Sequence, residues 1–135
     1  MTVTVLITML LVIVLLQPTR DRLYTAAIFA QVTFFHDALL GDIDSGWYYA
    51  SAGAADVLIM ILLLPVSHRC ETAYRITHVA FVSMILNVLG WFLWYNFYEP
   101  TVYDASFIVL YVTAIITLLT RHGDNKHGGV DNSGM

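Results

Sequence analysis

The chain has 135 residues, of which 59% are hydrophobic and 12% are charged, and its formal net charge is -4. Soluble domains are typically about 45–50% apolar and about 25% charged, so this composition excludes an ordinary soluble fold. A nucleic-acid partner is also excluded, because it would need a basic face and the few basic residues are dispersed. We expect one domain whose apolar side chains are accommodated by a lipid bilayer.

Five apolar runs follow one another along the chain, and each predicts a transmembrane helix. They cover residues of about 2–16, 23–40, 47–66, 76–95 and 103–120. The predicted fold is therefore all-α, a polytopic transmembrane helical bundle formed by residues 1–120. Residues 121–135 form a polar tail with too few apolar residues to fold on its own, and we expect it to be disordered.

The first run is the shortest and stops at Gln17-Pro18. As a helix it would be about 22 Å long, whereas the hydrocarbon core is about 30 Å thick. It spans only if the bilayer thins locally or its uncharged start lies in the interface. If it only dips into the membrane, the N-terminus is cytoplasmic, and the four remaining transmembrane helices keep the same orientation.

The third run combines aromatic residues at its start with a stretch of small residues. Small residues spaced four apart let two helix backbones approach closely, which is how helices associate in lipid. We therefore predict that this run is the central helix. The predicted helix-packing residues are Ala50, Ser51, Gly53, Ala54 and Ala55.

The basic residues predict the orientation of the chain. All six Lys and Arg residues fall in the first and third gaps between apolar runs or after the last run. Short loops rich in Lys and Arg stay in the cytoplasm. We therefore predict a protein of the cell inner (plasma) membrane. Its N-terminus is outside and its C-terminus is cytoplasmic.

Aromatic residues gather at the run ends assigned to the outside, where Trp and Tyr favour the interface between lipid and water. We interpret them as an outer aromatic belt, with a docking surface for a protein or lipid as the alternative. Its members are Trp47, Tyr48, Tyr49, Trp91, Trp94, Tyr95, Tyr98 and Tyr103.

Polar residues inside a bilayer are costly, so each needs a partner or a purpose. At 1.5 Å per residue, four of them lie about 12–14 Å from the outer ends of their helices and form one midplane layer. They are Gln31, Asp56, Asn87 and Tyr111. Three interpretations stay open: the groups satisfy one another, they form a proton, cation or solute site centred on Asp56, or they contact another subunit.

His36 and Asp37 form a second polar pair about one turn below the outer surface. Such a pair could sense outside pH or relay protons, or it could face a neighbouring helix or headgroup water. One haem cannot join His36 to His78, because the two histidines lie near opposite surfaces. We predict no metal, no cofactor and no enzymatic activity.

For a bundle of this kind we expect the lipid bilayer as one partner. The other partner is either further copies of the chain or other membrane subunits. The leading function is a non-enzymatic accessory or structural subunit of a membrane assembly. One alternative is a lesion-forming phage protein, because the chain resembles holins in its small size, several apolar helices and polar tail. The other is a small proton- or solute-coupled transporter centred on Asp56.

Overall fold

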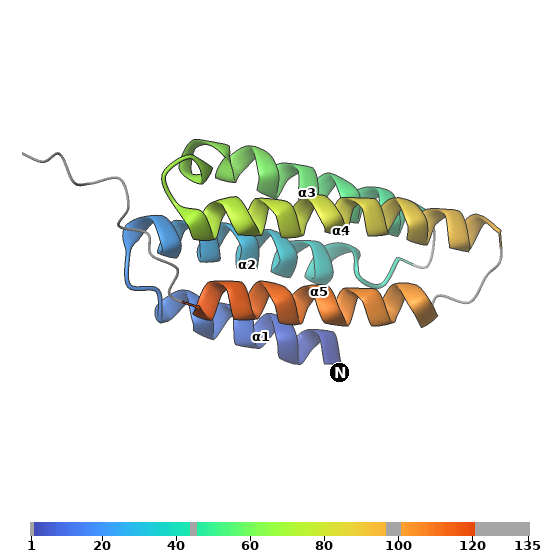
Figure 1. Ribbon diagram of the computed structural model, residues 1–135. Coiled ribbons are helices and arrows are strands. Elements are labelled where there is room, and N and C mark those ends of the chain that lie inside the picture. Colours follow the sequence, from blue (N-terminus) through green and yellow to red (C-terminus); the bar gives the residue numbers. More distant parts are fainter. Residues whose placement is uncertain (1, 44–45, 97–100, 121–135) are drawn as a thin grey trace, which may run out of the picture.

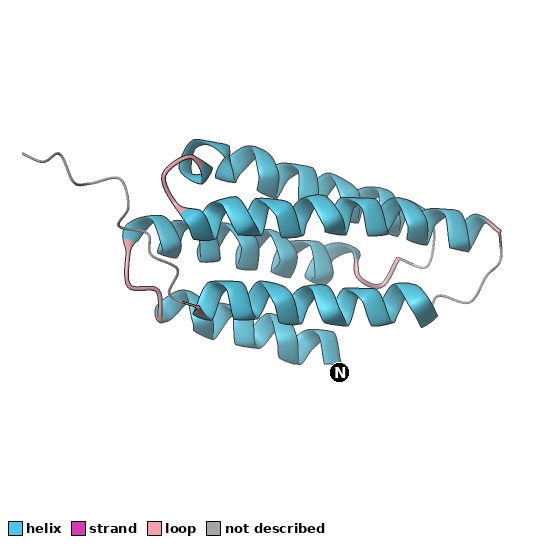
Figure 2. Ribbon diagram, viewed as in Figure 1, coloured by secondary structure: helices cyan, strands magenta, loops and turns pink. Residues whose placement is uncertain are grey.

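The computed structural model describes residues 2–43, 46–96 and 101–120, and all regular structure in these ranges is helical (Figure 1, Figure 2). The helices are α1 (Thr2–Leu15), α2 (Arg20–Leu40), α3 (Gly46–Ser67), α4 (Glu71–Tyr95) and α5 (Thr101–Leu119). The prediction of five helices is thus confirmed for the described residues. The predicted tail, residues 121–135, lies outside them.

Four of the helices, α2 to α5, are long and apolar enough to cross a membrane. Helix α1 has 14 residues, which corresponds to about 21 Å and is shorter than the hydrocarbon core. It is not among the four candidate spans in the described part of the chain.

Two helices begin three or more residues earlier than the apolar runs predicted. Helix α2 begins at Arg20 because the Thr19 hydroxyl accepts a hydrogen bond from the backbone N–H of Arg22, at 3.4 Å, and so caps the helix. Helix α4 begins at Glu71, whose carboxylate pairs with Arg75 one turn later at 2.9 Å. Hydropathy finds only the apolar part of a helix, so it omitted these polar first turns.

Successive helices run in alternating directions, which divides the connections between two ends of the bundle (Figure 1). One end carries the α1–α2 and α3–α4 connections and the end of α5. We call it the basic end, since Arg20, Arg22, Arg69 and Arg75 lie there. The other end carries Asp42 and Asp104 near the α2–α3 and α4–α5 connections, and we call it the acidic end.

Helix α3 packs most extensively against α4, α2 lies against both of them, and α5 packs on α4. Helix α1 packs against α2 and α5 and stops short of the acidic end (Figure 1). The main core cluster is entirely apolar. It consists of Leu10, Ile13, Ala26, Phe29, Ala30, Ile59, Leu63, Ile76, Val79, Ala80, Ala114, Ile115 and Leu118.

The buried guanidinium of Arg22 closes the basic end. Its exposed fraction is 2%, and its Nη2 donates to the backbone carbonyls of Leu118, at 2.6 Å, and Thr120, at 3.0 Å. Its Nε donates to the side chain of Gln17 at 3.2 Å. A cation there satisfies the terminal carbonyls of α5 and lies at the negative end of the helix dipole. From the sequence, Arg22 indicated only the orientation of the chain.

Candidate functional site

The polar centre of the bundle is a hydrogen-bonded row of three side chains from three helices. Asn87 Nδ2 on α4 donates to Asp56 Oδ2 on α3 at 2.8 Å. The hydroxyl of Tyr103 on α5 donates to Asn87 Oδ1 at 2.9 Å. All three residues are buried, and so is Ser83, which lies one turn before Asn87 on α4. Each of these bonds ties one helix to another at a fixed height, so the row sets the register of α3, α4 and α5.

Gly90 makes room for this row. A Cβ atom at position 90 would lie 2.6 Å from Tyr49 Cε1 and would also overlap the ring of Tyr103. The two tyrosine rings pack edge to face with their centroids 5.1 Å apart. The absence of a side chain at Gly90 therefore lets the Tyr103 ring cross α4 and reach Asn87. Nothing in the sequence pattern pointed to this glycine.

The predicted midplane layer is brought together only in part. Asp56 and Asn87 bond directly, and Tyr111 lines the same cavity as both of them. Gln31 differs, because it lies on an exposed face of α2 and does not line that cavity. Ser83 and Tyr103, which were not expected in the layer, lie next to Asn87 and Asp56 instead.

A small cavity of about 40 Å³ adjoins Asp56. A water molecule needs about 10–15 Å³ of such space and two to four polar partners. Helices α2, α3, α4 and α5 all contribute to its wall. The residues that line it are Val32, Thr33, His36, Tyr48, Ala52, Ala55, Asp56, Ile59, Ser83, Asn87, Phe107 and Tyr111.

His36 joins this cavity to the acidic end, while its neighbour Asp37 does not line the wall. The side chain of His36 is half-buried, and its Nε2 lies 3.1 Å from Ser51 Oγ. Ser51 in turn donates its hydroxyl proton to the carbonyl of Tyr48 at 2.8 Å. The predicted polar pair is thus divided, with only the histidine placed toward the centre.

The predicted helix-packing residues lie on two sides of α3. Ser51 and Ala55 turn inward, toward His36 and the cavity. Ala50 and Ala54 are exposed on the outer face of the bundle. Gly53 faces α4, where an added Cβ atom would lie 3.9 Å from Asn87 Cβ, an ordinary contact.

The predicted aromatic belt also divides between two environments. The indole of Trp47 is 77% exposed, and Trp91, Trp94 and Tyr95 are exposed as well. Tyr48 and Tyr49 are half-buried, and Tyr103 is buried. The tryptophans therefore suit an interface with lipid, whereas Tyr103 belongs to the polar row. Tyr98 lies outside the described residues.

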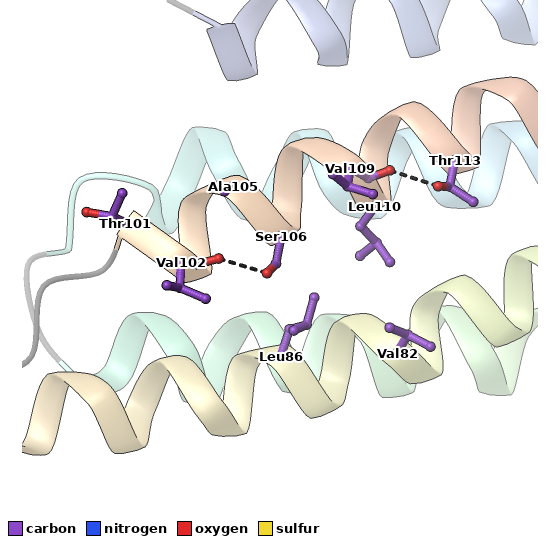
Figure 3. Close-up of a pocket in the computed structure, with 9 residues that line it drawn as sticks. All are labelled: Val82, Leu86, Thr101, Val102, Ala105, Ser106, Val109, Leu110 and Thr113. Atoms are coloured by element: carbon purple, nitrogen blue, oxygen red, sulfur yellow. Dashed lines mark hydrogen bonds between the residues drawn. The ribbon is translucent and has the colours of Figure 1, made fainter.

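An apolar groove of about 530 Å³ runs between α4 and α5 (Figure 3). The Ser106 hydroxyl donates to the carbonyl of Val102 at 2.7 Å, and the Thr113 hydroxyl donates to that of Val109 at 2.8 Å. These two hydroxyls are thus bonded within their own helix. The groove is lined by Val82, Leu86, Thr101, Val102, Ala105, Ser106, Val109, Leu110 and Thr113.

His36 lies toward the acidic end of α2, and the exposed His78 lies toward the basic end of α4. The two histidines that hold one haem would have to lie at similar depth, so this pair cannot share a haem. In residues 2–43, 46–96 and 101–120, no group of three or more His, Cys, Asp or Glu side chains is arranged to hold a metal ion. Comparison of the chain with models of known protein families, with curated proteins and with solved structures gives no match.

Proposed function

We propose that the chain is a small integral membrane protein that serves as a non-enzymatic accessory or structural subunit of a membrane assembly. The row of Asp56, Asn87 and Tyr103 carries this proposal, because these buried polar groups bond to one another across three helices. A row of this kind fixes helix register. The four long apolar helices support a location in the bilayer.

The proposed orientation has the basic end in the cytoplasm and the acidic end outside. The four described arginines support it, since short loops rich in Arg stay in the cytoplasm. The membrane we propose is the cell inner (plasma) membrane. In this orientation the tail is cytoplasmic. The N-terminus is outside where the bilayer thins enough for α1 to span it.

The outer face of α3 supports association with further copies or with another subunit. Ala50 and Ala54 are one turn apart and exposed, so a second helix backbone could approach closely there. The experiment is to measure the assembly mass of the full chain in lipid nanodiscs by native mass spectrometry. We expect an oligomer that Ala54→Leu dissociates. Ala38→Leu, at an exposed position on α2, is the matched control and should leave the mass unchanged.

A monomer that neither substitution alters would contradict self-association. Inducible expression of the full chain in cells tests the lesion-forming, holin-like alternative. We expect harmless accumulation of a structural subunit. Abrupt killing with loss of membrane potential would favour the lesion-forming function instead.

A second candidate function, a proton- or solute-coupled transporter centred on Asp56, is favoured by the cavity beside that carboxyl group. Intramembrane carboxyl groups often mark ion and proton pathways. Flux into vesicles containing the purified full chain tests it. A folded Asp56→Asn protein that has lost a flux seen in the wild type would support transport, whereas equal flux in both would exclude a role for this carboxyl.

A further inference from the structure

The cavity beside Asp56 has the composition of a water site. At its wall Asn87 hydrogen-bonds to Asp56, and the Ser83 hydroxyl group lies on the same wall. Thr33 and Tyr111 also line it, and no hydrogen bond to their hydroxyl groups is found within the described part of the chain. A buried water typically bonds to about three polar groups that would otherwise be unsatisfied. The cavity of about 40 Å³ supplies both the space and these groups.

The cavity is closed toward the basic end. Ile59 lies at its wall one turn beyond Asp56 and belongs to the apolar core cluster. Leu63, in the same cluster, follows it on α3, and Leu10 and Ile13 of α1 add to the cluster from the side. From Ile59 to Leu63 this barrier is about 6 Å deep along the helix axis. A chain of hydrogen-bonded water cannot pass through closely packed apolar side chains.

Toward the acidic end, the wall consists of side chains that water can reach. His36 and Tyr48 line the cavity and are both half-buried. Because Ser51 gives its hydroxyl proton to the Tyr48 carbonyl, the bond of His36 to Ser51 Oγ requires a proton on His36 Nε2. In the neutral imidazole, Nδ1 is then the acceptor. This nitrogen has no hydrogen-bond partner among the described residues and can take up a proton from water.

The row at the closed end can accommodate Asp56 with or without a proton. In the observed arrangement Asn87 Nδ2 donates to the carboxyl group and Tyr103 donates to Asn87 Oδ1. If the carboxyl is protonated, it can donate to Asn87 Oδ1 after the amide turns over. Asn87 Nδ2 then donates to the Tyr103 oxygen. Both arrangements keep every member of the row hydrogen-bonded.

We propose that the cavity holds ordered water through which Asp56 exchanges protons with the acidic end only, and that His36 is the entry group. A proton taken up by the imidazole passes to a cavity water, and that water gives a proton to the Asp56 carboxylate. The products are neutral His36, an unchanged water and a neutral carboxyl group, so no charge or atom is left over. The inference concerns the same cavity as the second candidate function, but one-sided proton binding requires no transport.

Few other charged groups face this route. On α2 the neighbour of His36 is Asp37, and on α3 Tyr48 lines the cavity with Tyr49 beside it. On α5 Tyr111 lines the cavity, and Tyr103 and Asp104 are the other titratable groups near the route. From α4 only the neutral Ser83 and Asn87 reach the wall. The described arginines all lie at the basic end, beyond the apolar barrier.

Infrared spectroscopy of the full chain in lipid nanodiscs tests the proposal, with the C=O stretch of a protonated carboxyl as the signal. We expect a band that appears as the pH is lowered and that is absent in Asp56→Asn. After a rapid pH jump, Ala55→Val should slow its appearance several-fold, because the added methyl groups occupy the cavity. Ala38→Val, at an exposed position on α2 that does not line the cavity, is the matched control and should respond like the wild type. His36→Leu should also slow the response.

Both faces of a nanodisc contact the solution, so these rates report which end admits the proton. Equal rates for the wild type, Ala55→Val and His36→Leu would overturn the proposal, because the proton would then arrive by another route. A wild-type spectrum with no band that depends on Asp56 would overturn it as well. If Ala55→Val does not fold, His36→Leu makes the same comparison. Absence of flux in the vesicle assay would count against transport and leave this result unaffected.

Discussion

Replacement of Gly90 by Ala should destabilise the bundle, although alanine is the better helix former. In a helix Ala is favoured over Gly by about 1 kcal/mol. At position 90, however, the new methyl group would lie 2.6 Å from Tyr49 Cε1 and would also overlap the Tyr103 ring. Overpacking of a filled core typically costs about 1–3 kcal/mol.

The two rings cannot move independently, because they pack edge to face at a centroid distance of 5.1 Å. Displacement of Tyr103 also lengthens its hydrogen bond to Asn87, and such bonds in membranes contribute about 0.6 kcal/mol on average and at most about 1.7. With the average hydrogen-bond contribution added and the gain in helix propensity subtracted, the net loss is about 0.6–2.6 kcal/mol.

Equilibrium unfolding of the full chain in mixed detergent micelles, followed by circular dichroism, measures this difference. Gly53→Ala is the matched control on the neighbouring helix, since its Cβ atom would meet only Asn87 Cβ at 3.9 Å. We expect Gly53→Ala to be neutral or stabilising by up to about 1 kcal/mol. A Gly90→Ala protein as stable as the wild type would refute the argument that this glycine admits the Tyr103 ring.

Three further predictions concern the basic end, the topology and the polar row. Arg22→Gln should lower the free energy of unfolding by about 1–3 kcal/mol, because it leaves the last carbonyls of α5 without their donor. Arg20→Gln, at an exposed position, should change the free energy of unfolding little. Equal losses in the two variants would contradict the role of Arg22 at the end of α5. A C-terminal reporter should read cytoplasmic and a tag between Asp42 and Gly46 external, and a cytoplasmic signal from that tag would overturn the proposed orientation. Asp56→Asn should keep the fold within about 1 kcal/mol, since the amide oxygen still accepts from Asn87, while Asp56→Leu should unfold more readily in the same assay; the reverse order would show that the row does not stabilise the bundle.

The helices and their polar centre could be predicted because both depend on position along one helix. An apolar run gives the approximate extent of a transmembrane helix. The rise of 1.5 Å per residue gives the depth of each polar side chain. Asp56 and Asn87 were placed at the same depth in this way, and they bond at 2.8 Å.

Rotation about the helix axis could not be predicted in the same way. Gln31 has the depth of Asp56, but it follows the buried Ala30 by one residue, which turns it by about 100° away from the core. In a soluble helix the polar face reveals this angle. In lipid both the core face and the outer face are apolar, so the sequence contains little signal for it.

Because this rotation could not be predicted, the sequence did not identify Tyr103 as a hydrogen-bond partner of Asn87. Its place near the start of α5 predicted a residue of the interfacial belt, yet its exposed fraction is 6% and its hydroxyl reaches Asn87. The cause lies on another helix, where Gly90 leaves the space that the ring fills. A tyrosine becomes part of the polar centre only when a neighbouring helix offers such a space at the right depth, and this depends on a pair of residues rather than on either one. Small and polar residues of different membrane helices therefore have to be considered together, because close approach at one position decides which hydrogen bond is made at the other.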